Sequence, residues 1–161
     1  MAQSGERRGG AEEKSALVGL CLGIGDHLYC PKLPGRVEDC LAMVDLLLKW
    51  KFVVHFGVNC GLKEMKTKIR QLFATVASTP DSTLVIYYTG YVVQHLGVNY
   101  LVPADSQVQL AADIEDCCVS LTWLFAGLRE VSDCTPVVLL DSAHPQPFRQ
   151  TWISPSEQLP L

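Results

Sequence analysis

The sequence lacks a long apolar run, a cluster of basic residues and any Cys-x-x-Cys pair. Without a run of about eighteen apolar residues, no membrane-spanning helix is expected. The only adjacent basic pair is Arg7-Arg8, and 13 basic against 17 acidic residues give a net charge of −4, so nucleic-acid binding is not expected. Structural zinc is not expected either, although His27-x-x-Cys30 has the spacing of a ligand pair. We therefore expect no metal and no cofactor.

Signals for secretion and for lipid attachment are also missing from the first residues. They contain no apolar run of signal-peptide type, and Ala2 departs from the myristoylation pattern. The seven cysteines are an odd number, which cannot pair completely within one chain. We therefore expect a reducing compartment, namely the cytoplasm, with the nucleus also compatible.

The composition is that of one globular domain. Of the 161 residues, 48% are hydrophobic and 19% are charged, a balance that excludes a wholly disordered chain. Residues 1–14 are polar and rich in glycine, which predicts a disordered leader. Residues 147–161 contain three prolines and no periodicity, which predicts a flexible tail. The domain is expected to span residues 15–146.

Hydrophobic patterning predicts strands that alternate with helices. Continuous apolar or β-branched runs predict strands over 16–23, 52–58, 83–88 and 136–141. Spacings of three and four predict helices over 36–49, 62–77 and 120–129, the last capped by Ser120. Residues 90–105 are expected to form an excursion with a hairpin turn at 95–97. The alternation predicts an α/β fold, a three-layer sandwich around a mainly parallel sheet.

The helical patterns also predict which side chains face the core. The inward stripes are Val37, Leu41, Val44, Leu47 and Leu48 in the first helix, Leu62, Met65, Ile69, Leu72, Phe73 and Val76 in the second, and Leu121, Leu124, Phe125 and Leu128 in the third.

Catalytic and binding groups in open α/β sheets gather beyond the carboxyl ends of the strands. One such end carries Gly23-x-Gly25, part of a pattern that cradles phosphate groups. The third glycine is missing, and the next helix is expected about a dozen residues later, past two prolines. Nucleotide binding is therefore not expected.

Four stretches in this order carry a resemblance to a known family. They are Ala16–Tyr29, Leu33–Cys40, Tyr87–Gln94 with its continuation Asn99–Asp105, and Val138–His144. Together they resemble the caspase-like cysteine peptidases, particularly the metacaspase and paracaspase branch, over about residues 14–145. The resemblance implies a caspase-like fold with flavodoxin-like strand order. It also implies that only the large-subunit half is present, truncated after the fourth core strand.

Two departures from the family pattern remove its catalytic groups. Tyr91 occupies the position of the catalytic histidine, and Ala143 occupies the position of the catalytic cysteine. Attack on an amide needs an activated nucleophile with a base within hydrogen-bond reach. Alanine offers no nucleophile, and a phenol of pKa about 10 is a poor base at neutral pH. Loss of such groups typically costs roughly 10⁴ to 10⁶ in rate, so the resemblance implies an inactive site.

Substitute catalytic groups are not expected nearby. Ser142 and His144 flank Ala143, but adjacent residues on an extended segment point to opposite faces, so Ser142 is expected to point away from the site. The cysteines at 117, 118 and 134 do not follow predicted strands and are expected to be inert thiols.

The resemblance implies that part of a substrate pocket survives. In the branch that recognises basic residues, acidic side chains at the positions of Asp39 and Asp141 line the pocket for arginine or lysine. Two carboxylates can hold a guanidinium by charge-assisted hydrogen bonds. The alternative is that Asp39 only lies at the start of a helix, where a carboxylate is favourable without any ligand.

The leading hypothesis is a catalytically inactive caspase-like domain that acts as a protein-interaction or regulatory module. Its partner would be a related protease, an adaptor or a second copy, bound through the apolar strand edge 136–140, which the truncation would leave exposed. The main alternative is a cysteine endopeptidase of this clan that cleaves after basic residues. A truncated gene product without a biochemical role is the third possibility.

Overall fold

The structure, a computed structural model, describes residues 15–79, 81–132 and 134–143. These residues form a six-stranded sheet and four helices. The strands are β1 (Leu17–Gly23), β2 (Val53–Val58), β3 (Thr83–His95), β4 (Val98–Leu101), β5 (Val119–Ser120) and β6 (Val137–Ala143). The helices are α1 (Arg36–Lys49), α2 (Leu62–Ser78), α3 (Asp113–Cys117) and α4 (Leu121–Val131). The expected leader 1–14 and tail 147–161 lie outside the described residues.

Four strands form a parallel sheet in the order β2-β1-β3-β6. If the parallel strands alone are counted along the chain, this order is second, first, third and fourth, which agrees with the predicted flavodoxin-like order. The third strand is longer than the predicted 83–88, because Val92–His95 continues it and pairs antiparallel with β4. Leu96 and Gly97 form the turn with positive φ angles of 48° and 78°, so the predicted hairpin is confirmed.

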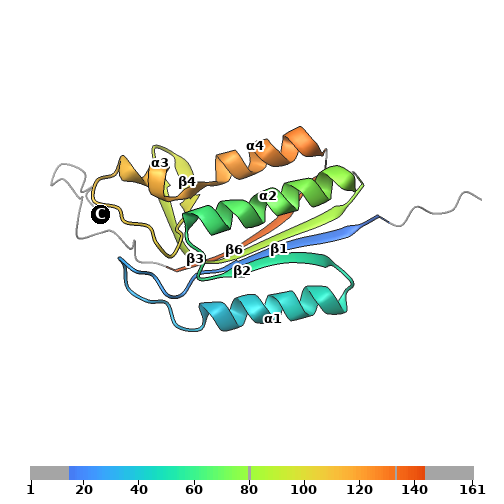
Figure 1. Ribbon diagram of the computed structural model, residues 1–161, viewed down its shortest axis with the longest axis horizontal. Coiled ribbons are helices and arrows are strands. Elements are labelled where there is room, and N and C mark those ends of the chain that lie inside the picture. The colour runs from blue at the N-terminus through green and yellow to red at the C-terminus, as the bar shows by residue number, and fades with distance from the viewer. Residues whose placement is uncertain (1–14, 80, 133, 144–161) are drawn as a thin grey trace, which may run out of the picture.

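The helices cover both faces of the sheet, and the predicted three layers are confirmed. Figure 1 shows α1 alone on one face and α2 with α4 on the other. Strand β1 is buried almost throughout, as expected for a central parallel strand. The larger core cluster joins β1 and β3 to α2 and α4 through the side chains of Leu20, Leu22, Ile86, Tyr88, Met65, Ile69, Leu72, Leu124 and Leu128.

The inward faces of α2 and α4 agree with the sequence pattern, but that of α1 was partly mispredicted. Leu41 and Leu48 of α1 are exposed. The buried residues of this helix are Cys40, Val44 and Leu47, and they pack on β1 and β3. Because Cys40 counts as a small apolar residue, the buried stripe follows positions i, i+4 and i+7. Leucine alone was therefore a poor guide to the face.

Two helix starts show how distant residues complete local structure. Ser120 caps α4, and its hydroxyl accepts a hydrogen bond from the Trp123 amide at 3.3 Å, as predicted. Helix α2 has no side-chain cap of its own. Instead the carboxylate of Asp105 accepts from the Leu62 amide at 2.8 Å. Helix α3 was not predicted, because five residues are too few to show a period.

Strand β6 forms one edge of the parallel sheet. Within the described ranges it pairs with β3 alone, from Val85–Val137 to Tyr91–Ala143. Its side chains remain accessible on both faces, with Val137, Leu139 and Leu140 exposed by 54, 42 and 40%. The expected exposed apolar edge is therefore present in the described part of the chain. No helix in that part is long and apolar enough to cross a bilayer.

Candidate functional site

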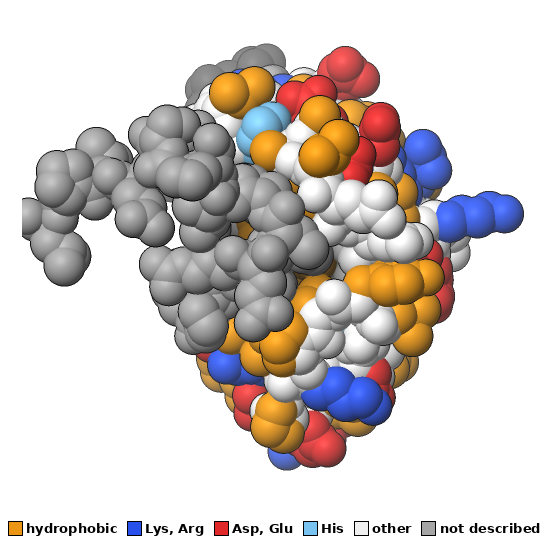
Figure 2. All heavy atoms as spheres, turned by 90° about the vertical axis from the view of Figure 1, so that its left-hand side faces the viewer, with side chains coloured by type: hydrophobic (Ala, Val, Ile, Leu, Met, Phe, Trp, Pro, Cys, Tyr) orange, Lys and Arg blue, Asp and Glu red, His pale blue; other side chains and the backbone are white. Residues whose placement is uncertain are grey.

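The parallel strands end together on one side of the molecule, and Figure 2 looks onto that end. Acidic and hydrophobic side chains lie near each other on its described part, and basic side chains are spread singly around the margin. Here β3 and β6 bring Tyr91 and Ala143 directly opposite each other as paired residues of adjacent strands. The two residues that the resemblance predicts at the positions of the base and the nucleophile are thus neighbours across the sheet.

Tyr91 is a buried structural residue in this position. Its side chain is 3% exposed, and its hydroxyl donates a hydrogen bond to the carbonyl oxygen of Pro31 at 3.2 Å. Burial is the main cause that raises the pKa of Tyr91, with Cys30 adding to it. The phenol therefore stays protonated and donates a hydrogen bond to a backbone oxygen. It cannot serve as a general base at neutral pH.

Ala143 contributes a methyl group to the same surroundings. It is half-buried and packs against the cluster that contains Tyr91, Val102 and Ile114. An alkyl side chain in apolar contact has no atom that could attack a carbonyl group. Ser142 beside it is half-buried as well, and His144 lies outside the described residues.

The imidazole of His27 lies at this end of the sheet, in the loop after β1. It is 4% exposed, and its ring centroid is 4.9 Å from that of Tyr91. Neither ring nitrogen makes a well-aligned hydrogen bond, although the backbone carbonyl groups of Pro103 and Ile24 lie close enough to affect the pKa of the ring. Burial lowers the pKa of His27, although the carbonyl groups of Pro103 and Ile24 and the charge of Asp26 oppose the effect. The ring is therefore neutral at pH 7.

No described histidine is bonded to a thiol. His55, on β2, is hydrogen-bonded through Nε2 to the hydroxyl of Thr75 in α2, at 2.8 Å. The seven cysteines are free. Burial raises the pKa of Cys30 to about 11 and that of Cys118 to about 12. Thiols with raised pKa values are weak nucleophiles at neutral pH, because the thiolate is the reactive form.

Asp39 and Asp141, the expected pocket residues, both lie within ion-pair distance of the Arg36 guanidinium. Arg36 Nη1 is 2.7 Å from Asp141 Oδ2 and 3.9 Å from Asp39 Oδ2. The same nitrogen donates to the hydroxyl of Thr89 at 3.2 Å. Helix α1, strand β3 and strand β6 thus supply one polar group of four side chains. The basic side chain that contacts both carboxylates belongs to this chain.

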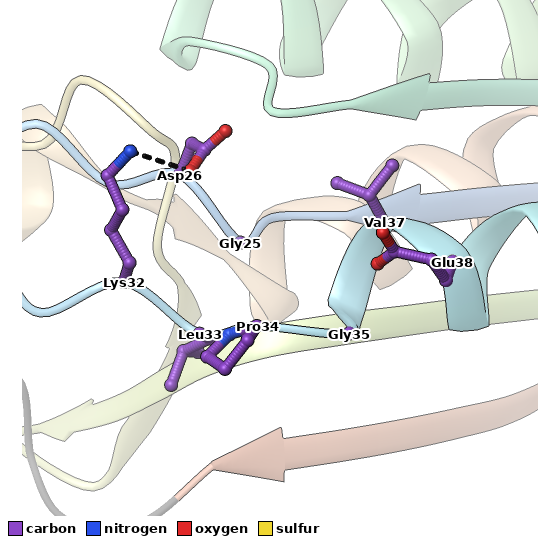
Figure 3. A pocket seen from close by; sticks show the side chains of 8 residues that line it. All are labelled: Gly25, Asp26, Lys32, Leu33, Pro34, Gly35, Val37 and Glu38. Atoms are coloured by element: carbon purple, nitrogen blue, oxygen red, sulfur yellow. Dashed lines mark ion pairs between the residues drawn. The ribbon is translucent and has the colours of Figure 1, made fainter.

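The loop between β1 and α1 forms a pocket of about 250 Å³ beside this group. Asp26 and Lys32, which help to line the pocket, form an ion pair with a distance of 3.0 Å between Lys32 Nζ and Asp26 Oδ1 (Figure 3). The Gly25 and Asp26 amides donate to the side-chain oxygen of Asn59, so they are not available to a phosphate. A side chain at Gly23 would collide with Cys40 of α1. The glycines therefore serve close packing, which argues against the phosphate-loop pattern.

The described residues contain no group of three or more histidine, cysteine or acidic side chains that could hold a metal ion. His27 and Cys30, which have the spacing of a ligand pair, both lie in the loop after β1. Neither ring nitrogen of His27 has a well-aligned hydrogen-bond partner that would orient the ring toward a metal ion.

Sequence reasoning missed two residues of this site. Arg36 was treated only as the first residue of a helix, yet its position three residues before Asp39 allows an i,i+3 ion pair. His27 was considered only as a metal ligand, and nothing local predicts its burial against Tyr91. The Arg36–Asp141 ion pair and the His27–Tyr91 contact each join chain segments more than fifty residues apart.

Comparison with protein families identifies the chain. A family model described as "Caspase domain" matches residues 18–158. The match begins within β1 and includes the other five strands of the described residues, their four helices and the positions of Tyr91 and Ala143. No curated protein matches the chain.

Proposed function

The chain belongs to the caspase domain family, and on that premise we propose that it is a catalytically inactive member of the metacaspase and paracaspase type that acts by binding another protein. The observation that carries the proposal is the pairing of Tyr91 with Ala143 across β3 and β6. A buried phenol and a methyl group lie at the positions of the base and the nucleophile.

The loss of either group would by itself remove nearly all catalysis. Removal of the nucleophile or the base from a peptidase dyad typically lowers the rate by roughly 10⁴ to 10⁶, and the two effects are not additive because the groups act together. No described thiol is hydrogen-bonded to an imidazole. A peptidase reaction would therefore need a nucleophile from elsewhere.

We further propose that the edge of β6 is the binding surface. An edge strand presents unpaired backbone N–H and C=O groups, which another chain can extend by strand addition. The exposed side chains of Val137, Leu139 and Leu140 would contact alternate residues of the added strand. The proposed partner is a related protease or an adaptor that supplies an extended apolar segment. Pairing with a second copy is the competing occupant.

Peptide hydrolysis tests the loss of catalysis. We expect the full chain to release no product from fluorogenic peptides that end in arginine, lysine or aspartate, beyond the rate of buffer alone. The matched control is the Tyr91→His/Ala143→Cys double variant, which returns both groups to adjacent strand positions. Hydrolysis by the wild type after a basic residue, abolished by substitution of one cysteine, would support the endopeptidase alternative instead.

A further inference from the structure

The guanidinium of Arg36 lies deeper than the carboxylates that hold it. The Arg36 side chain is 22% exposed, whereas those of Asp39 and Asp141 are 54 and 47% exposed. Below it, Thr89 is fully buried, and its hydroxyl meets both Arg36 at 3.2 Å and Asp141 at 3.5 Å. A basic side chain that reached these carboxylates from solvent would find Arg36 already in place.

We propose that Arg36 is a built-in occupant of the Asp39 and Asp141 carboxylates, an autoinhibitory contact that keeps arginine and lysine side chains of other proteins out of this position. The inference goes beyond the proposed function, and it holds whether or not β6 binds a partner. It concerns an ion pair between residues 105 positions apart, which joins the first turn of α1 to the end of β6.

The competition favours the internal residue. A half-exposed ion pair is weak, so a free arginine side chain would bind two such carboxylates with a Kd of roughly tens of millimolar or weaker. Arg36 is tethered by the first turn of a helix, and even a flexible tether gives an effective concentration of millimolar order. A partner at micromolar concentration therefore cannot displace it.

The acceptor geometry leads to the same result. Asp141 Oδ2 accepts from Arg36 at 2.7 Å and lies within reach of the Thr89 hydroxyl. An incoming guanidinium that bound this oxygen would share it with the resident one, and the two like charges would lie within a few ångströms of each other. Such a pair is unfavourable even near a protein surface.

Removal of the Arg36 charge should open the position. In the Arg36→Gln variant of the full chain, acetyl-arginine amide should bind at least about twofold more tightly than to the wild type, with a Kd of roughly tens of millimolar. The neutral isostere acetyl-citrulline amide should not bind. The further change Asp141→Asn should abolish binding, because it removes the shorter of the two carboxylate contacts. Arg129→Gln is the matched control and should behave as the wild type, because Arg129 lies in the last turn of α4, near the opposite end of β6.

The inference is overturned if wild type and Arg36→Gln bind acetyl-arginine amide equally, or if folded Arg36→Gln and Arg36→Ala both fail to bind it. A measurement on the wild type needs no variant. The side-chain NMR signals of Arg36 should stay unchanged as acetyl-arginine amide is added to millimolar concentration. A saturating shift at micromolar ligand would contradict internal occupancy. Peptide hydrolysis reports on the proposed function separately, so the two failures are distinguishable.

Discussion

At the scale of single residues, Tyr91 contacts its surroundings as a structural side chain does. Its hydroxyl holds the carbonyl oxygen of Pro31, in the loop that follows β1, and its ring packs on His27. These contacts join the hairpin end of β3 to the loop after β1. The residue therefore has a role in stability that does not depend on catalysis.

The variant Tyr91→Phe measures this role. It removes only the hydroxyl, so the Pro31 carbonyl loses a hydrogen bond, and the free energy of unfolding should fall by about 1 kcal/mol. Urea denaturation at pH 7 gives the value, and Tyr29→Phe, at an exposed position, is the control. An unchanged stability would show that the hydroxyl contact contributes nothing.

His27 should make stability depend on pH. Burial lowers its pKa in the folded chain, so the unfolded chain binds the proton more readily. The stability is then fully present above the ordinary histidine pKa of about 6.5 and is lost as the pH falls below it, by at most about 1.4 kcal/mol per pH unit. Urea denaturation between pH 5 and 8 should show a shallower slope for His27→Gln than for the wild type.

The lowered pKa of His55, caused by partial burial and then by Lys68, adds a second contribution of the same sign. His55→Gln therefore serves as the comparison for His27→Gln. A slope that His27→Gln leaves unchanged would mean that this ring is hydrated in solution.

At the scale of elements, α2 begins with help from a distant residue. Helix ends leave amide groups without partners, and α2 has no side-chain cap of its own. Asp105 supplies the missing acceptor from 43 residues away. Asp105→Ala should therefore lower the free energy of unfolding by about 1 kcal/mol, whereas Asp105→Asn, which keeps an oxygen, should lose less. Equal losses would show that the amide–oxygen contact is not the cause.

The edge of β6 makes an independent prediction about association. A lysine on an edge strand prevents strand addition, because its charge would be buried in the new pair. Leu139→Lys should therefore abolish binding of an apolar partner strand, and any concentration-dependent dimer, with little effect on unfolding. Analytical ultracentrifugation with and without the partner checks this. Leu28→Lys, equally apolar and more exposed, is the control; loss of binding in both variants would argue against the edge.

At the scale of the whole molecule, the layers and the parallel strands follow from sequence patterns, and the strand order follows from the family resemblance. Strand β1 is continuously apolar, and α2 buries its side chains at helical spacing. The extension of β3 past residue 88 was harder to predict, because Val92–His95 is stabilised by pairing with β4 rather than by a local pattern. Helix α3 has too few residues to show a period.

The chemistry of the site divides in the same way. The positions of Tyr91 and Ala143 could be read from motifs, because each follows a strand that the sequence predicts. The ion pair between Arg36 and Asp141 and the burial of His27 could not, because both depend on how separate loops and helices meet beyond the sheet. Long-range contacts of this kind leave no local signal.

The central claim is that the folded chain has no activated thiol. The most direct test is the rate at which each cysteine of the native full chain reacts with iodoacetamide between pH 5 and 9, read by mass spectrometry. Burial raises the pKa values of Cys21, Cys40 and Cys60 to about 12, so these thiols should stay unmodified until the chain unfolds. No cysteine should react with an apparent pKa below that of a free thiol, about 8.5. A cysteine that reacts rapidly at pH 6, and loses that reactivity when one histidine is replaced, would contradict the account.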